Sequence, residues 1–382
     1  KLDFKKIMKE MKDATVPYSR KIYESLKKNK EIDFYDKETY FVDKYTLKIG
    51  EQKIKGKNIF IASGARPFIP DIKGIDKIDF LTNETLLDLE KIPKSIIIVG
   101  GGYIAAEYSH FFSAIGTKVK IIQKNKRLVP DEEPEISNLL KEELGERTEI
   151  YLKTEVVELG KQGNELYAIG KKGNKKIKIK AEKILIAVGR KSNADLLKVE
   201  NSGIETDERD YIKVNDYLET NIPNIWAIGD ATGKQMFTHA SVEEAEIVWR
   251  NFVNGGRYKL KFDFSRVPHA IFSHPQIAAI GLTEEQAKKN YKILIGKSYY
   301  KDVAKGEALR EEKGFSKAIV EQKTEKILGF HIIGPYAPIL IQEVINVMNL
   351  KNGIDIILKS MHIHPEITEL IQTTFGSLKP VD

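Results

Sequence analysis

A histidine and a glutamate late in the sequence have the types and spacing needed for proton transfer. His364 stands directly before Pro365, and Glu369 follows five residues after the histidine. A carboxylate beside an imidazole fixes its tautomer and keeps its pKa near working pH, as a general acid or base requires. Pro365 favours the first position of a helix, which would place Glu369 about one turn further in. His362 leaves two other interpretations open, a metal-ligand pair or ordinary surface histidines; no acidic cluster accompanies it, and we expect no metal.

A glycine-rich turn between two apolar runs has the pattern of a phosphate-binding loop. The run 95–99 leads into three successive glycines, and a helix-like pattern follows before the second run at 119–122. Gly100 permits a tight turn, Gly102 lets the backbone approach a pyrophosphate, and Ala105 is small enough for the helix to pack on the strand. The pyrophosphate would lie on free N–H groups at the helix N-terminus. The flanking strands favour a dinucleotide site over a merely structural turn.

The residues after the second run bear on which nicotinamide nucleotide would bind. In NAD-binding proteins an acidic residue about 20 positions on takes the ribose 2′-hydroxyl. Here that place holds Gln123, Lys124, Asn125, Lys126 and Arg127, with no acid. Basic side chains attract a 2′-phosphate that a carboxylate would repel, so NADP is the predicted cofactor and NAD the alternative. A solvated loop in a lysine-rich protein is the other interpretation.

A second glycine turn lies downstream, where the apolar run 225–228 ends in Gly229 and Asp230. Taken alone, a Gly-Asp pair after a strand is as often a turn or helix-capping aspartate as a ligand. A helix is expected to start near Thr238, where the threonine could also be a simple N-cap.

Together these motifs resemble the flavoprotein disulfide reductases, a family that includes dihydrolipoamide dehydrogenase, glutathione reductase and mercuric reductase. The resemblance covers nearly the whole sequence. In that family the aspartate of the Ile-Gly-Asp motif contacts FAD, and the helix after it points its N-terminus at the flavin ring, where the helix dipole favours negative charge. Residues 58–67 resemble the segment by which the chain leaves the flavin domain, and residues 184–190 the strand by which it returns. The cofactor-binding residues expected on this basis are Gly64, Gly100, Gly102, Ile104, Glu107, Gln123, Lys124, Lys126, Gly189, Gly229, Asp230, Thr238 and His239.

The resemblance also assigns roles to the catalytic pair and to one carboxylate of the nucleotide helix. It implies that His364 exchanges a proton with a thiol of the substrate and that Glu369 orients it. Glu107 would pair with a lysine beneath the flavin. That lysine has no counterpart in this sequence, so the role of Glu107 stays open.

Other parts of the family pattern are also absent. The N-terminal GxGxxG motif and the pair of redox cysteines are not in the sequence, which has no cysteine in 382 residues. Dithiol–disulfide exchange needs an attacking thiolate, which these residues cannot supply. Residues 1–29 resemble the long helix that follows the redox helix, so we expect one βαβ unit and a helix to be missing before them. The alternatives are a non-thiol relative, such as a soluble transhydrogenase, or a catalytically incomplete scaffold. The retained His364 and Glu369 favour neither alternative, but a truncated or partly ordered copy of a protein that has the redox cysteines.

The expected fold class is α/β, with two Rossmann-like three-layer domains that bind FAD and NAD(P), and an α+β dimerisation domain. The FAD domain would comprise residues 1–86 and 191–261 without its N-terminal part, the NAD(P) domain residues 87–190, and the dimerisation domain residues 262–382. Apolar residues recur near helical spacing in the first segment and predict a packing face rather than a membrane helix. Those residues are Phe4, Ile7, Met8, Met11, Ile22, Tyr23 and Leu26.

Composition agrees with a soluble globular protein, at 41% hydrophobic and 31% charged residues. The net charge of +7 could indicate nucleic acid, but the lysines alternate with acids along the chain. Residues 171–180 form the densest lysine cluster and read as a hairpin that turns at Gly173 and Asn174, with lysines that protect an exposed edge. We therefore expect no nucleic acid and no membrane. The expected protein is a cytoplasmic homodimer acting on a small-molecule disulfide or dithiol; mercuric ion is less favoured, because no cysteine pair stands near residue 382.

Overall fold

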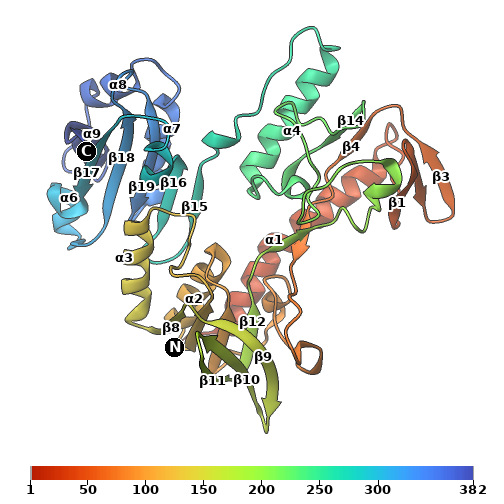
Figure 1. The fold of residues 1–382 in the computed structure, drawn as a ribbon, viewed down its shortest axis with the longest axis horizontal. Helices are drawn as coiled ribbons and strands as arrows, with labels where there is room; N and C mark the ends of the chain where they lie inside the picture. The colour runs from red at the N-terminus through yellow and green to blue at the C-terminus, as the bar shows by residue number, and fades with distance from the viewer. Residues whose placement is uncertain (1, 382) are drawn as a thin grey trace. The chain divides into compact units, whose positions relative to one another are not determined.

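The computed structural model describes residues 2–381, which divide into two compact units. The chain passes between the units more than once, so each unit is assembled from segments that are distant in sequence (Figure 1). Unit 1 comprises Lys1–Phe68, Glu84–Ile92 and Gly189–Phe264, and unit 2 comprises Ile69–Asn83, Pro93–Val188 and Ser265–Asp382.

Unit 1 is built around a short parallel strand pair. Strands β14 and β4 run side by side with Ile225 opposite Ile59, and their inward residues are buried in one apolar cluster. On the other face, Phe60 stacks on Trp226 at 5.0 Å and meets Phe252 of α4 edge-on. These aromatic contacts fix α4 against the strands. The elements are α1 (Phe4–Lys28), β1 (Thr39–Asp43), β2 (Thr46–Ile49), β3 (Gln52–Lys55), β4 (Ile59–Ile61), β5 (Ala65–Pro67), β13 (Arg190–Ser192), β14 (Ile225–Ala227) and α4 (Thr238–Val253).

The first helix confirms the predicted helical segment but only part of its packing face. Asp3 caps α1 by accepting a hydrogen bond from the Lys6 N–H at 3.1 Å. Phe4 and Met8 are buried, whereas Ile22 is 47% and Leu26 39% exposed. The prediction was wrong for Ile22 and Leu26, whereas Tyr23 between them packs edge-on against Phe34 at 5.4 Å.

The part of unit 2 that contains the predicted phosphate-binding turn has three layers. Strands β12, β6, β7 and β8 form a parallel sheet, and the β9–β10–β11 antiparallel sheet packs against one of its faces. Helix α2 packs against β6 and β7. Burying each isoleucine of β6 contributes about 1.5–3 kcal/mol, which explains the continuous apolar run in a strand covered on both sides. The elements are β6 (Ser95–Val99), α2 (Tyr103–Ala114), β7 (Lys118–Gln123), α3 (Pro134–Gly145), β8 (Thr148–Leu152), β9 (Glu155–Gln162), β10 (Glu165–Lys172), β11 (Lys175–Ala181) and β12 (Lys183–Ile186).

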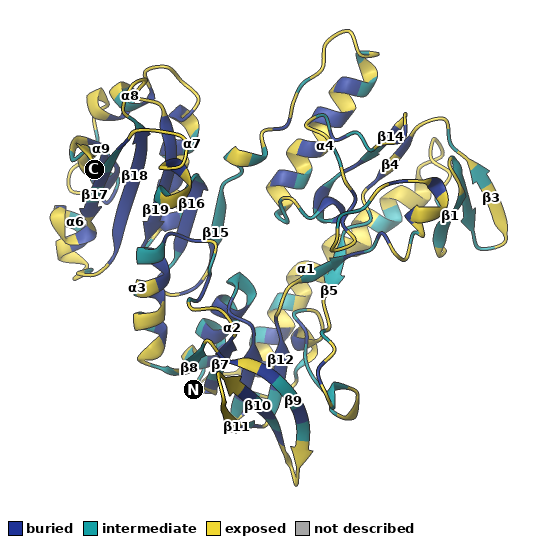
Figure 2. Cartoon of the chain, viewed as in Figure 1, coloured by how far each residue is buried: buried dark blue, intermediate teal, exposed yellow. Residues whose placement is uncertain are grey.

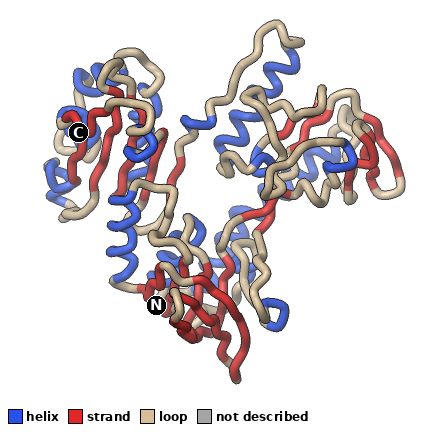
Figure 3. The backbone as a smooth tube through the Cα atoms, viewed as in Figure 1, coloured by secondary structure: helices blue, strands red, loops and turns tan. Residues whose placement is uncertain are grey.

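The predicted lysine hairpin is confirmed. Strand β10 pairs with β11 with Lys172 opposite Lys175, which leaves Gly173 and Asn174 as the turn. The lysines of the first half of β11 are exposed (Figure 2). Figure 3 draws the strands of this part of the chain in red.

The C-terminal part of unit 2 is a six-stranded sheet in the order β15-β16-β19-β18-β17-β20. Helices α7 and α9 cover one face, where Phe330 stacks on Phe375 at 5.7 Å. The central strands are buried along their whole length (Figure 2). The elements are β15 (His269–Ile271), β16 (Ile277–Gly281), α5 (Glu284–Ala287), β17 (Ile293–Tyr299), α6 (Ala304–Ala308), β18 (Phe315–Glu321), β19 (Ile327–Ile333), α7 (Ala337–Val347), α8 (Gly353–Lys359), α9 (Glu369–Gly376) and β20 (Lys379–Pro380).

Among residues 2–381, no helix has both the length and the apolar character that crossing a bilayer would require.

Candidate functional site

The first and last glycines of the turn after β6 are glycines for different physical reasons. Gly100 has φ +121°, and a Cβ there would lie 2.1 Å from the Ala187 carbonyl oxygen. Its N–H donates to the Ile122 carbonyl at 2.9 Å, which ties the turn to β7. Gly102 precedes α2, and a Cβ there would meet no atom within 4 Å. The space beside Gly102 is therefore open to a ligand, while Gly100 is required by the fold.

Helix α2 carries the next two expected nucleotide residues. Ile104 lies in its first turn and is partly exposed. Glu107 accepts a hydrogen bond from the Phe272 N–H at 2.9 Å, so this carboxylate has a backbone partner that the sequence did not reveal. Burial raises the pKa of Glu107, and that hydrogen bond opposes the rise only in part.

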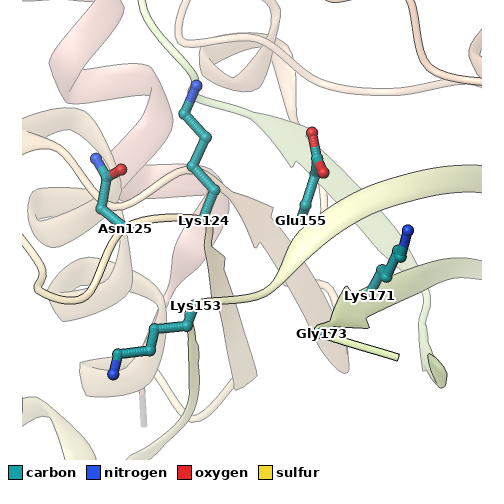
Figure 4. Close-up of a pocket in the computed structure, with 6 residues that line it drawn as sticks. All are labelled: Lys124, Asn125, Lys153, Glu155, Lys171 and Gly173. Carbon is teal, nitrogen blue, oxygen red and sulfur yellow. The ribbon is translucent and has the colours of Figure 1, made fainter. Parts of the chain in front are cut away.

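The polar residues at and after the end of β7 differ in how far they are buried. Gln123 is buried and packs against the glycine turn. The packing is so close that a Cβ on Gly101 would lie 2.7 Å from the Nε2 atom of Gln123. Lys124 is the first exposed side chain after β7, and Lys126 is also exposed. Lys124 lines a hollow of about 380 Å³ (Figure 4), whereas Lys126 is not among the lining residues.

The lining of this hollow includes two lysines that sequence reasoning missed. The lining residues are Lys124, Asn125, Lys153, Glu155, Lys171 and Gly173. Lys153 could have been found from the sequence, because it follows the next parallel strand, β8, whose end meets the same sheet edge. Lys171 could not, because only the folded hairpin brings it there.

In unit 1, the expected flavin residues include three glycines in left-handed backbone conformations. Gly64 has φ +67°, Gly189 φ +131° and Gly229 φ +66°. Asp230, directly after Gly229, forms an ion pair with Arg190, with 3.3 Å between Oδ2 and Nε. This aspartate is therefore held by an arginine rather than used as a helix cap.

Two buried polar atoms near these glycines lack a hydrogen-bond partner among the described residues. They are the Ser63 Oγ atom and the Glu244 Oε1 atom. The other oxygen of Glu244 accepts from the Gly229 N–H at 2.5 Å, and burial raises the pKa of this carboxyl group. Unpaired buried polar atoms are costly, so they indicate a polar partner such as a ligand or water.

The start of α4 is as expected. The helix begins at Thr238, and the residue before it, Phe237, makes no side-chain capping bond. Thr238 is thus a helical residue and not the N-cap, which excludes the simple-cap interpretation. His239 lies in the first turn, with its ring stacked on Phe237 at 5.6 Å.

The structure brings His364 and Glu369 together. The distance from Nδ1 of His364 to Oε1 of Glu369 is 3.0 Å, and Oε2 of Glu369 accepts from the Glu366 N–H at 3.3 Å. The hydrogen bond from His364 is the largest cause that lowers the pKa of Glu369. The imidazole is 70% exposed. With Nδ1 held by the carboxylate, Nε2 is the nitrogen left for proton transfer.

One expectation about this segment was wrong. Helix α9 begins at Glu369 and not at Pro365, since residues 365–368 form turns instead of a first helical turn. Glu369 reaches the histidine from the first position of the helix.

The neighbouring His362 is engaged elsewhere. Its Nε2 atom lies 2.9 Å from Oε1 of Glu343, and its Nδ1 atom lies 3.1 Å from the Ser360 carbonyl oxygen. The two histidines therefore have separate partners. In the part of the chain that the structure describes, no three His, Cys, Asp or Glu side chains are grouped as metal ligands would be.

Within unit 2, a buried charge cluster was also missed by sequence reasoning. Lys317 on β18 is 5% exposed, and its ammonium contacts carboxylates of Glu284 at 2.6 Å, Glu133 at 3.0 Å and Glu135 at 3.2 Å. Burial would lower the pKa of Lys317, but the hydrogen bond that its ammonium donates to Glu284 and the charge of Glu133 outweigh this effect, so the net pKa is raised. Nothing in the sequence separates this lysine from the many exposed ones.

Comparison with known proteins places this geometry in context. Residues 3–245 match the model of the pyridine nucleotide-disulphide oxidoreductase family, and residues 267–375 match that of its dimerisation domain. The chain is similar to mercuric reductase from Lysinibacillus sphaericus, with 33% identity over 83% of this chain and 60% of the reductase. It is 32% identical to dihydrolipoyl dehydrogenase from Synechocystis sp., over 84% of this chain and 70% of that protein. The chain thus spans 60% of the length of the first of these relatives.

A solved structure agrees with both matches. The HOCl-induced flavoprotein disulfide reductase RclA from Escherichia coli superimposes with a TM-score of 0.87 at 28% identity, over 98% of this chain and 86% of that one. The predicted α/β fold class, with FAD/NAD domains and a dimerisation domain, is confirmed. Sequence, fold and solved structure agree: the chain belongs to the pyridine nucleotide-disulphide oxidoreductase family.

Proposed function

We propose that this chain supplies the nucleotide sites and the proton-transfer pair of an FAD-dependent NAD(P)H:disulfide oxidoreductase that resembles dihydrolipoamide dehydrogenase. The observation that carries the proposal is the His364–Glu369 hydrogen bond. A glycine turn with open space beside it, at the end of a parallel strand, supports it independently. The proposed domains are residues 1–86 and 191–261 for FAD, 87–190 for NAD(P) and 262–382 for dimerisation. The proposed location is the cytoplasm, where thiols are kept reduced.

The residues present fit a nicotinamide nucleotide. The open space at Gly102 leaves room for a ligand beside the start of α2, and helix N-termini bind pyrophosphate. Lys124 lies at the same edge of the sheet, where the adenosine ribose is expected. We propose that NADP is bound there in preference to NAD, because the exposed residues after β7 are basic.

The residues present also fit a flavin. The left-handed glycines let backbone approach a ligand closely, and the unpaired oxygens of Ser63 and Glu244 offer polar partners. Asp230 and the α4 N-terminus at Thr238 would hold the group. A bound flavin supplies hydride exchange with nicotinamide and passes electrons to a disulfide.

The role of His364 is to move a proton at Nε2 while Glu369 fixes the ring. When a substrate disulfide is reduced, a thiolate leaves and must be protonated; in the reverse direction the thiol must lose its proton. An exposed imidazole with a hydrogen-bonded carboxylate can do both. The chain contains no cysteine, so the thiols of the exchange lie outside these 382 residues.

A homodimer is part of the proposal. Beside the pair, Met361 is 99% and Ile363 76% exposed. Apolar side chains exposed to this degree favour burial against another surface, and the matched dimerisation domain contains both residues.

The test is anaerobic titration of the purified protein with NADPH, followed by addition of lipoamide or another small disulfide. Flavin absorbance that is bleached by NADPH and restored by the disulfide would support the proposal. Restoration by NAD⁺ alone would favour a transhydrogenase. Protein without flavin, which binds none when FAD is added, would indicate a scaffold and contradict the proposed activity.

A further inference from the structure

The hollow at the end of β7 is assembled from segments that are far apart in sequence. Lys124 and Asn125 follow β7, Lys153 follows β8, Glu155 opens β9, and Lys171 lies near the tip of the β10–β11 hairpin. The Lys153 N–H donates to the Asn125 carbonyl at 3.0 Å, which joins the ends of the two parallel strands. Figure 4 shows the three lysines on separate segments around the hollow, with Lys124 and Lys171 pointing up in this view and Lys153 pointing down.

The hairpin tip is held beside these strand ends by its pairing with β9. Lys171 lies opposite Glu155 in the β10–β9 register. Side chains alternate along a strand, so Lys171 and Lys172 point to opposite faces of the hairpin. Only Lys171 of the two lines the hollow.

The backbone at Lys153 is unusual for a lysine. Its φ of +54° is the left-handed conformation that glycine or asparagine normally occupies. For other residues this conformation costs roughly 1–2 kcal/mol. This conformation turns the chain sharply between β8 and β9, at the edge of the hollow.

The ammonium groups of the hollow are not neutralised by the protein. Within the described part of the chain, Lys124, Lys153 and Lys171 form no ion pair, unlike Lys120 and Lys180 nearby. The lining therefore has three cations and one carboxylate, Glu155. Lysine stems are flexible, so the three groups can converge on one anion.

We propose that Lys124, Lys153 and Lys171 form a binding pocket for the 2′-phosphate of NADP(H), with the lysine hairpin as its outer wall. This inference rests on the proposed nicotinamide site, because the hollow lies at the sheet edge that receives the adenosine ribose. It gives the hairpin a recognition role instead of edge protection alone. Lys126 and Arg127 lie outside the hollow, so the specificity determinants come from three strands and not from one loop.

The test compares two probes that differ only in the 2′-phosphate, adenosine 2′,5′-bisphosphate and adenosine 5′-monophosphate, by calorimetry on the purified chain. The wild type should bind the bisphosphate more tightly. Lys171→Ala and Lys153→Ala should each weaken bisphosphate binding about tenfold, as for loss of one charge-assisted contact, and should leave the monophosphate within about twofold. Glu155→Gln should strengthen bisphosphate binding, since it removes the repelling charge.

Lys172→Ala is the matched control, because it removes the same charge one residue away on the other face. Equal effects of K171A and K172A would overturn the inference by reducing it to general charge. Equal affinity of the wild type for both probes would overturn the inference yet leave nucleotide binding intact. Failure to bind either probe would overturn both the inference and the proposed nucleotide site. If NADH reduced the flavin as well as NADPH does, only the inference about the 2′-phosphate would be overturned.

Discussion

His364 and Glu369 are joined by a 3.0 Å contact between Nδ1 and Oε1, although one lies in a turn and the other opens a helix. The contact leaves the imidazole exposed while the carboxylate is held a second time by the Glu366 N–H. A fixed carboxylate with an exposed imidazole is the arrangement a proton-transfer pair requires.

The first prediction concerns this pair. In a protein that also supplies the redox thiols, His364→Gln should lower disulfide reduction by about 10²–10⁴-fold, the usual contribution of a general acid or base. It should also raise the pKa of Glu369 toward its ordinary value, because the hydrogen bond that lowers this pKa is lost. Carboxyl NMR titration measures the second effect without turnover. His362→Gln, which breaks a separate pair with Glu343, should raise the pKa of Glu369 less, because the charge of His362 lowers that pKa less than the His364 hydrogen bond does.

The second prediction separates the two glycines of the nucleotide turn. Gly100→Ala should destabilise the protein by more than about 2 kcal/mol, because its φ and the nearby Ala187 carbonyl exclude a side chain. Gly102→Ala should cost no more than about 1 kcal/mol, since its Cβ meets no atom. Denaturant unfolding measures both changes.

Binding then gives the complementary result. Gly102→Ala should weaken binding of ADP at least about tenfold, because the new methyl occupies the space proposed for pyrophosphate. A folded Gly102→Ala variant with unchanged ADP affinity would contradict the assigned position of the pyrophosphate.

The third prediction addresses the buried ammonium of Lys317. Lys317→Met should destabilise the protein by about 3–5 kcal/mol, because it leaves the buried carboxylate of Glu133 without a counter-charge. The other two glutamates keep lysine partners, Glu284 with Lys288 and Glu135 with Lys297. Lys313→Met is the control, since Lys313 also contacts three glutamates but is 44% exposed. The control should cost about 0–1 kcal/mol. Similar losses of unfolding free energy in the two variants would show that burial of the lysine does not make one ion-pair cluster more important for stability than the other.

The fourth prediction is a pH dependence at Glu107. Its pKa is raised in the folded protein, so the folded state binds this proton more tightly than the unfolded state does. The penalty for ionising it is absent below the unfolded pKa, grows as pH rises between the unfolded and folded values, and is complete above the folded value. Glu107→Gln keeps an acceptor for the Phe272 N–H and should be more stable than wild type at pH 8. The difference in unfolding free energy should shrink toward pH 4.5, and a constant difference would contradict the assignment.

Local patterns sufficed for several features. The run 95–99 with its glycines specified a strand, a turn and a helix start, because strand hydrophobicity and glycine turns are properties of adjacent residues. The hairpin turn at Gly173 was predictable for the same reason. The length of the first helix was also predictable, but not which residues of its apolar stripe would be covered, since coverage depends on distant segments.

The sequence by itself determined the glycine turn after β6, the alternation of strands and helices, and the choice of His364 and Glu369 as a candidate pair. Only the tertiary structure decided that Lys317 is buried among glutamates, that Asp230 meets Arg190, and that Lys171 stands beside Lys153 at the end of β7. The physical reason is that adjacent residues set backbone conformation, whereas burial and charge pairing depend on which distant segments the packing brings together. The sequence alone does not show whether a lysine is solvated, paired with a carboxylate or available to bind an anion.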